Sequence, residues 1–303
     1  MRTDELLGLS PSGFHKISYT DWGDPASERV VICVHGLTRN CRDFDVLAEA
    51  LADECHVVCP DVAGRGRSDW LYNKEDYSYP QYMADANALI ARAMAKPAAA
   101  GILNKLATLI SRRHGPRTLY WVGTSMGGML GMMLASRPNS PIRKLVVNDV
   151  GPLIPKASLE RIGNYVGKDP RFKTYDELKT YIRTISAPFG PLTDAQWHHL
   201  TLTGAKEHTD GTWGMSYDPG IGEVFRKGPV KDVNLWPFWD TITCPTLVLR
   251  GGDSDLLLRN TAEEMQSRGP RAKLVEFAGI GHAPMLMADD QVKVVKDFLL
   301  APD

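Results

Sequence analysis

The sequence lacks three features that would each indicate a class of protein. Its cysteines are only five, odd in number and scattered, which does not suit a disulfide framework. Its 35 basic and 36 acidic residues leave a formal net charge of −1, so there is no field to attract a nucleic-acid backbone or an anionic bilayer. Its apolar runs fall well short of the ~20 residues that span a membrane. We therefore expect no nucleic-acid partner and no membrane insertion.

The amino terminus also lacks the pattern of a secretory signal, because Asp4 and Glu5 are acidic and no apolar run follows them. Together with the scattered cysteines, this favours a cytoplasmic protein whose thiols are reduced packing residues. His198, His199 and His208 lack carboxylates or thiols at ligand spacing, so we expect no metal site. No organic cofactor is expected either.

What the sequence does contain is an alternation of short β-branched runs with longer segments of helical period. Such an alternation is typical of an α/β fold, a mostly parallel sheet with helices on both faces. Residues 14–21 alternate apolar and polar side chains, which predicts an antiparallel edge strand. The expected parallel strands are 29–34, 56–59, 118–122, 144–147, 246–249 and 273–277, and the expected helices are 43–52, 80–95, 126–136, 261–267 and 290–299.

Residues 151–236 interrupt this rhythm. They contain no strand-like run, they are rich in Gly and Pro, and their helical patterns are short, as at 175–184 and 193–202. We interpret them as a helical cap inserted into a core that comprises residues 1–150 and 237–303. The segment is rich in large aromatics, of which Trp213 and Tyr217 are candidate substrate contacts. The Ala-rich stretch 96–114 is expected to add another helix and receives no functional interpretation.

Residues 123–127, Gly-Thr-Ser-Met-Gly, match the G-x-S-x-G pattern. The match by itself is weak, but it follows an apolar strand and opens a helix, as a nucleophile elbow requires. There the serine is held at a positive φ with its Oγ above the sheet, and the flanking glycines let strand and helix pass closely. Ser125 is therefore the candidate nucleophile.

The turn after residues 29–34 contains His35, Gly36 and Leu37. We expect it to bring the backbone N–H of Leu37 toward the elbow, where it and the N–H of Met126 would form an oxyanion hole. That role needs only backbone groups. His35 is interpreted as a structural residue that braces the loop.

His282 follows the last strand, at the sheet edge where ligands bind in such folds, and is the candidate general base. The orienting acid has three candidates. Asp255 is preferred because it gives the spacing G-x-x-D counted from Gly252, while Asp253 reads as a turn residue. Asp149 also ends a strand on the same edge, and all three have the chain order serine, acid, histidine.

On these residues the chain resembles the α/β-hydrolase superfamily, specifically its capped serine hydrolases related to esterases, lactonases and carbon–carbon hydrolases. The resemblance covers nearly the whole chain outside 96–114 and the cap, and implies the roles given above for Ser125, His282 and Asp255. It also implies that residues 61–68, with Asp61 and Arg65, form a structural loop. The matching segments are 34–36, 60–68, 123–128, 148–152, 252–255 and 281–282.

The predicted function is hydrolysis of a small to medium, apolar carboxylic ester through an acyl-enzyme. Lactone opening and carbon–carbon cleavage with the same residues are the alternatives, because one scaffold supports several chemistries. A ligand-binding homologue with little turnover is the alternative from another class. Labelling of Ser125 by a fluorophosphonate would separate it from an enzyme.

Overall fold

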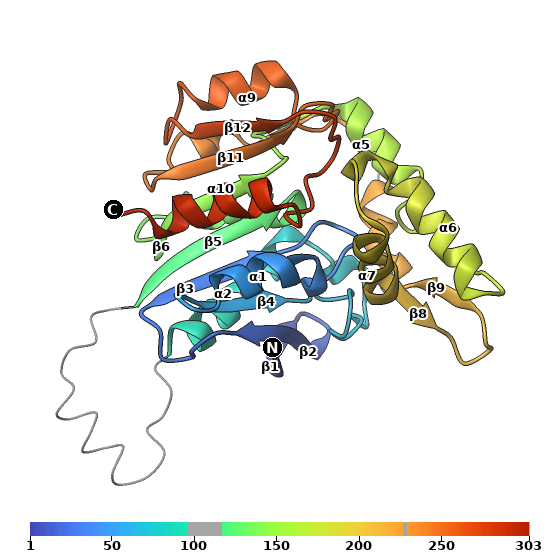
Figure 1. Cartoon of the computed structure of the whole chain (residues 1–303). Helices are drawn as coiled ribbons and strands as arrows, with labels where there is room; N and C mark the ends of the chain where they lie inside the picture. Colours follow the sequence, from blue (N-terminus) through green and yellow to red (C-terminus); the bar gives the residue numbers. More distant parts are fainter. Residues whose placement is uncertain (96–116, 227–228, 303) are drawn as a thin grey trace, which may run out of the picture.

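The structure, a computed structural model, describes residues 1–95, 117–226 and 229–302 and is built around an eight-stranded sheet (Figure 1). The strand order is β1-β2-β4-β3-β5-β6-β11-β12; β1–β2 and β2–β4 pair antiparallel and the remaining pairs are parallel. The predicted fold class is confirmed. The strands are β1 Arg2–Ser10, β2 Gly13–Trp22, β3 Arg29–Val34, β4 His56–Pro60, β5 Thr118–Thr124, β6 Ile142–Asn148, β11 Thr246–Gly251 and β12 Lys273–Phe277.

Helices cover both faces of the sheet, and the strand side chains alternate between them. In β3, Val31 and Cys33 pack in the cluster that includes α1 and α10, whereas Val30 and Ile32 pack in the cluster that includes α2 and α4. All four side chains are buried, which explains why β3 is uniformly apolar. The helices are η1 Cys41–Phe44, α1 Asp45–Leu51, η2 Lys74–Asp76, α2 Tyr79–Met94, α4 Met126–Ala135, α9 Arg259–Met265 and α10 Asp289–Leu300.

The segment between β6 and β11 is mainly helical and lies beside the carboxyl ends of the parallel strands (Figure 1). Helices α6 and α7 begin with capping boxes at Thr174 and Thr193. The sequence predicted no strand here, but two short pairs, β7–β10 and β8–β9, are present; strands this short carry no detectable periodicity. The elements are β7 Leu153–Ile154, α5 Lys156–Gly163, α6 Tyr175–Ile185, η3 Ala187–Phe189, α7 Asp194–Gly204, β8 Ala205–Glu207, β9 Trp213–Met215, η4 Pro219–Phe225, β10 Val233–Asn234 and α8 Trp236–Trp239.

The edge of the sheet differs from the prediction. Residues 14–21 do form an antiparallel strand within β2, but β1 pairs on its outer side and is the edge strand. Most of β1 is exposed, so the charged side chains of Asp4 and Glu5 remain in water. For the same reason β1 lacks the apolar alternation that marks a half-buried strand in a sequence. The helix expected at 96–114 lies outside the described residues.

Candidate active site

Ser125 stands at the sharp turn between β5 and α4, with φ 51° and ψ −114°. The two glycines of the motif are sterically required: a Cβ at Gly123 would overlap the backbone of Gly127, and one at Gly127 would overlap the carbonyl of Val34. The predicted strand, turn and helix are thus present, and the close passage of β5, α4 and β3 holds the serine in its unusual conformation.

His282 lies in the loop between β12 and α10 and faces Ser125, although 157 residues separate them in sequence. Its Nε2 is 3.0 Å from the serine Oγ, within hydrogen-bonding distance. The imidazole is largely buried, with a side-chain exposure of 15%. The two residues that the sequence singled out for nucleophile and base are therefore brought together.

The third member of the hydrogen-bonded chain is Asp149, which directly follows β6. Its Oδ2 is 2.8 Å from Nδ1 of His282. The carboxylate also accepts hydrogen bonds from the Gly251 N–H at 2.8 Å and the Ser254 hydroxyl at 2.7 Å. Asp149 is completely buried and has a positive φ of 54°, so its orientation is fixed by backbone and side-chain donors together.

The structure places Asp255, the acid preferred from the sequence, away from His282. Its carboxylate forms a bidentate ion pair with Arg161 of α5, at 2.5 and 2.9 Å, and its side chain is 52% exposed. Asp253 is exposed as well. Residues 252–257 form a turn, closed by a hydrogen bond from the Ser254 N–H to the Gly251 carbonyl at 2.9 Å, and Ser254 between the two acids is the residue that points inward to Asp149.

A signal for Asp149 existed in the sequence but was outweighed by the spacing argument. Asp149 ends the strand next to the one that carries Ser125, and the Ser125 N–H donates to the carbonyl of Asn148 at 2.9 Å. The amide of Asn148 in turn donates to the carbonyl of Pro284 at 2.8 Å, which ties the histidine loop to the same strand end. This adjacency of Asp149 to the strand before Ser125 is a property of the fold, which glycine spacing in the sequence does not report.

The loop after β3 and the start of α4 border Ser125. Met126 is the first residue of α4, so its N–H has no acceptor within the helix. Leu37 and Met126 both line the pocket that contains Ser125. The Gly36–Arg39 turn that carries Leu37 is closed by a hydrogen bond from the Arg39 N–H to the Gly36 carbonyl at 3.1 Å.

His35 braces this loop, as the sequence analysis proposed. Its Nδ1 lies 2.7 Å from the Gly36 carbonyl, and its Nε2 accepts from the Val62 N–H at 3.0 Å, an arrangement that requires a neutral ring. Complete burial lowers the pKa of His35 to about 3. The carboxylate of Asp61 has a similar bracing role, since it accepts from the N–H groups of Cys41 and Arg67.

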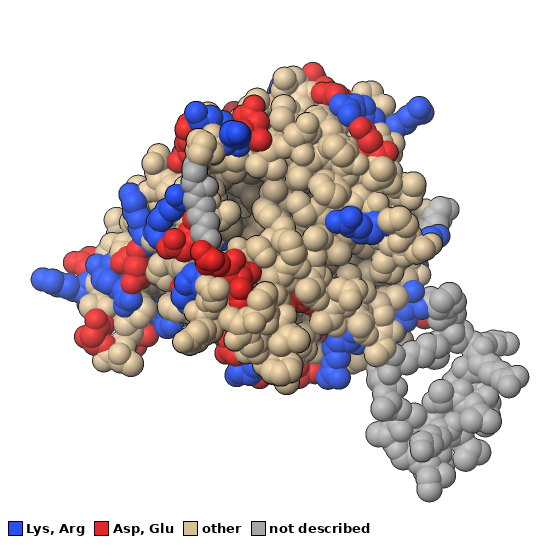
Figure 2. All heavy atoms as spheres, turned by 180° about the vertical axis from the view of Figure 1, so that it is seen from behind, with Lys and Arg blue, Asp and Glu red and all other residues tan. Residues whose placement is uncertain are grey.

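A cavity of about 640 Å³ opens between the sheet core and the segment that follows β6, and Ser125 lies in its wall. Figure 2 shows the surface hollowed on the side opposite to the view of Figure 1, with charged side chains near the hollow. The wall of the cavity is mainly apolar and includes Met129 and Met133 of α4 and Ile162 of α5. Four charged residues also line the cavity: Lys74, Glu75, Glu223 and Lys231.

The two aromatics proposed as substrate contacts are not among the described residues that line this cavity. Trp213 packs edge-on against Tyr175, with ring centroids 5.3 Å apart. Tyr217 is buried and its backbone bridges to Arg65 in the loop after β4. In this structure both residues contact other parts of the protein, and their role as substrate contacts stays a prediction.

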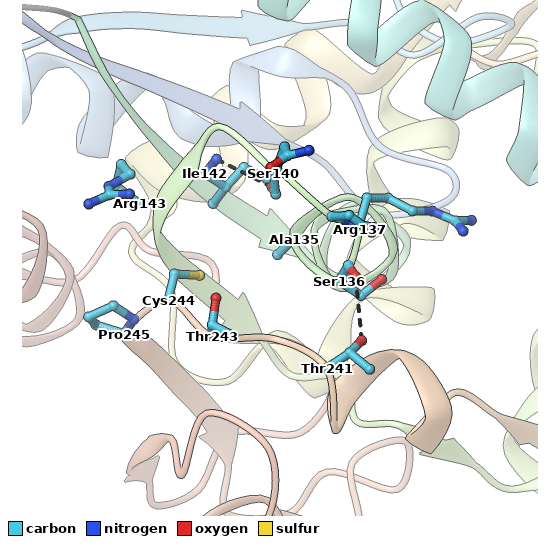
Figure 3. Close-up of a pocket in the computed structure, with 12 residues that line it drawn as sticks. Ala135, Ser136, Arg137, Ser140, Ile142, Arg143, Thr241, Thr243, Cys244 and Pro245 are labelled. Atoms are coloured by element: carbon cyan, nitrogen blue, oxygen red, sulfur yellow. Dashed lines mark hydrogen bonds between the residues drawn. The ribbon is translucent and has the colours of Figure 1, made fainter.

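A second cavity, of about 680 Å³, lies at the opposite end of the strands (Figure 3). It is formed by the residues between α4 and β6 and by the residues that lead into β11. Figure 3 shows the Thr241 hydroxyl bonded to the Ser136 carbonyl across it, while Arg137 and Arg143 lie apart at its margins. It is on the amino edge of the sheet, so it plays no part in the chemistry at Ser125.

Within the described part of the chain, no three His, Cys, Asp or Glu side chains are grouped so as to hold a metal ion. Of the three histidines considered above, His199 lies 2.9 Å from the Arg42 carbonyl. The described helices include none with the length and apolar character needed to cross a bilayer.

The chain matches the model of the Alpha/beta hydrolase family over residues 31–295. It is 45% identical to the 3-hydroxybutyrate-oligomer hydrolase of Cupriavidus necator, over 96% of this chain and 94% of that protein. The solved structure of a Rickettsia typhi protein described as a hydrolase is 30% identical and superposes with a TM-score of 0.87, covering 100% of both chains. An alpha/beta hydrolase from Novosphingobium aromaticivorans is 33% identical, with a TM-score of 0.80 and 98% of both chains covered. The chain belongs to the alpha/beta hydrolase family.

Proposed function

We propose that this protein is an ester hydrolase whose catalytic triad is Ser125, His282 and Asp149. The observation that carries the proposal is the unbroken hydrogen-bonded chain from Ser125 Oγ to His282 Nε2 at 3.0 Å and from His282 Nδ1 to Asp149 Oδ2 at 2.8 Å. With Nδ1–H donated to the carboxylate, Nε2 presents its lone pair to the serine hydroxyl. That is the tautomer a general base requires.

In the first half of the reaction, Ser125 Oγ attacks the ester carbonyl carbon while its proton passes to His282 Nε2. The carbonyl oxygen becomes an oxyanion that accepts hydrogen bonds from the N–H groups of Leu37 and Met126. When the tetrahedral intermediate collapses, the bond to the alcohol oxygen breaks and His282 returns the proton to that oxygen. An acyl-enzyme on Ser125 remains.

In the second half, water attacks the acyl carbon and gives one proton to His282 Nε2. Collapse of the second tetrahedral intermediate releases the carboxylic acid, and the proton returns to Ser125 Oγ. Asp149 stays ionised throughout and stabilises the imidazolium that forms in each half. All proton transfers take place between Ser125, His282, the leaving alcohol and water, and Asp149 exchanges none.

Residues 151–236 act as a cap over the core of residues 1–150 and 237–303. Elements of both parts wall the cavity: Met129 and Met133 come from the core helix α4, and Ile162 comes from α5 of the cap. The mainly apolar wall favours a small to medium apolar acyl chain. Lys231 among the lining residues suits a substrate that ends in a carboxylate.

A short linear oligomer of 3-hydroxybutyrate has this combination of methyl-bearing carbons, ester carbonyls and one terminal carboxylate. The Cupriavidus necator relative carries that substrate class in its name. We therefore propose such oligoesters as the substrate. The curated relatives favour ester hydrolysis over lactone opening, carbon–carbon cleavage and the ligand-binding alternative.

The test combines labelling and turnover. A fluorophosphonate should modify Ser125 of the wild type, identified by mass spectrometry of the peptide, and should not modify S125A. The wild type should convert a linear 3-hydroxybutyrate trimer to monomer, and S125A should lose about 10⁶-fold in kcat. Labelling at another residue would refute the triad. Activity on simple aryl esters with none on the trimer would refute only the substrate.

The state of the cysteines supports a cytoplasmic location for the protein. All five thiols are free, four of them are buried, and burial raises the pKa of Cys55 to about 11, which keeps that thiol protonated and unreactive. Free, inert thiols of this kind are typical of a reducing compartment.

A further inference from the structure

Arg65 is a completely buried arginine that forms no ion pair or hydrogen bond with a carboxylate within the described part of the chain. It sits in the loop after β4, between Gly64 and Gly66, which both have positive φ. A buried cation without a counter-ion loses its hydration and receives no ion-pair energy in return, so it is costly for the fold. Its position therefore calls for an explanation other than stability.

The guanidinium of Arg65 contacts both residues that flank the proposed oxyanion hole. Its Nε donates to the Leu37 carbonyl at 2.8 Å, and its Nη2 lies 3.7 Å from Sδ of Met126. Nη1 donates to the Ala63 carbonyl at 2.6 Å and to the Tyr82 hydroxyl at 2.9 Å. These contacts hold the planar group against the Leu37 carbonyl and the Met126 side chain, which belong to the two residues of the proposed oxyanion hole.

No neighbouring carboxylate forms an ion pair with Arg65 in the described part of the chain; its guanidinium lies instead over the rings of Tyr77 and Tyr82, at 5.7 and 5.0 Å from their centroids. Arg39, the other buried arginine near this loop, is paired with Asp43 in a bidentate arrangement. Asp218 lies close by, because its N–H donates to the Gly64 carbonyl at 2.7 Å, but its carboxylate accepts from the Tyr77 hydroxyl at 2.6 Å and from Lys74. The field of Arg65 does reach the loop: after burial, it contributes to the lowering of the pKa of His35.

We propose that Arg65 is a positioning residue for the oxyanion hole, which orients the Leu37 loop and places a positive charge behind the Leu37 and Met126 N–H groups. This inference rests on the proposed function. In the resting enzyme the charge faces no anion, and it is compensated when the substrate carbonyl oxygen becomes negative. In a preorganised site such a charge favours the transition state over the bound ester.

Three substitutions separate charge from hydrogen bonding. R65K keeps the positive charge and loses the planar fork, R65Q keeps an amide donor without charge, and R65M keeps neither. For each purified protein we would measure kcat and KM with 4-nitrophenyl butyrate, together with the inhibition constant of butylboronic acid. The boronate forms a negatively charged tetrahedral adduct with an active-site serine, so it reports oxyanion stabilisation separately from ester binding.

We expect R65M and R65Q to lose about 10- to 100-fold in kcat with KM changed by less than about threefold, and to bind the boronate more weakly by a similar factor. R65K should recover most of both losses. Equal activity of R65K and R65Q, or loss confined to KM, would overturn the proposal. If R65M does not fold, the comparison of R65K with R65Q still decides.

The outcomes also distinguish this inference from the proposed function. S125A should not bind the boronate at all; binding by S125A as tight as that by the wild type would count against the triad, not against Arg65. Boronate binding that requires Ser125 but is the same in wild type and R65Q would refute the role of Arg65 and leave the triad intact.

Discussion

At the scale of single residues, the site depends on which carboxylate orients His282. Asp149 has every feature of an orienting acid: it is fully buried, it is held by the Gly251 N–H and the Ser254 hydroxyl, and its Oδ2 contacts Nδ1 of the imidazole. Asp255 instead pairs with Arg161 at the surface. An exposed pair of this kind contributes little to stability, about 0–1 kcal/mol, and nothing to the tautomer of the histidine.

The first prediction compares D149N with D255N as a matched pair. D149N should lose on the order of 10⁴-fold in kcat, because an amide no longer selects the tautomer with Nδ1–H. D255N should keep kcat within about threefold, since it removes only a surface ion pair. Steady-state kinetics checks the pair, with thermal unfolding as the control. A larger loss in D255N would restore the acid chosen from sequence.

The second prediction concerns His35 and pH. In the folded protein burial lowers the pKa of His35 to about 3, whereas the unfolded chain has the ordinary value near 6.5. As pH falls from about 6.5 toward 3, only the unfolded state takes up this proton. The free energy of unfolding should therefore decrease by about 1.4 kcal/mol per pH unit from this residue alone.

H35Q isolates that contribution, because a glutamine amide can still accept from the Val62 N–H but does not titrate. Urea unfolding of both proteins from pH 7 to pH 4 should give curves of stability against pH that converge on acidification, with H35Q the less stable at pH 7. Parallel curves would mean that the ring is protonated in the folded state.

At the scale of elements, the elbow depends on how closely β5, α4 and β3 approach one another. Gly127 lies in the first turn of α4, and its Cα faces the carbonyl of Val34 in β3. Trp121 of β5 donates its indole N–H to the Gly127 carbonyl at 3.0 Å. The packing of three elements, and not the local propensity of the motif, therefore keeps Ser125 at its positive φ.

The third prediction is that G127A separates β3 from α4. The added methyl group meets backbone, which cannot yield as a side chain can, so the free energy of unfolding should fall by about 1–3 kcal/mol and fluorophosphonate labelling of Ser125 should slow. G163A, at the end of α5, is the matched control, because its Cβ would meet Phe225 at 3.5 Å, an ordinary contact. Equal stability of the two variants would disprove the steric argument.

These elements also explain what the sequence could predict. Ser125 and the helix after it follow from a local pattern of strand, turn and helix, and His282 follows from its place after the last strand. Asp149 could not be chosen over Asp255 in this way, because both follow strands of the same edge and only the fold decides which one reaches the imidazole. Trp213 illustrates the same limit, since packing within an inserted segment depends on distant residues.

At the scale of the whole molecule, the cavity that contains Ser125 lies between the core and the segment that follows β6. Ser125 stands at the first turn of α4, and Met126, Met129 and Met133 follow at intervals of three and four along one side of that helix. With a rise of about 1.5 Å per residue, Met133 lies ~12 Å along the helix from the serine. The three methionines thus form one apolar, flexible wall of the cavity, here called the methionine track, along which a substrate chain can pack.

The fourth prediction is that M133W shortens this track. An indole at the far end fills the space that a long acyl chain would use, so kcat/KM for 4-nitrophenyl decanoate should fall at least about tenfold. The value for 4-nitrophenyl butyrate should stay within about threefold, because that chain ends before it reaches Met133. L134W is the matched control, since Leu134 belongs to the same helix but does not line the cavity. Equal losses on both esters in M133W would show that the acyl chain does not run along α4.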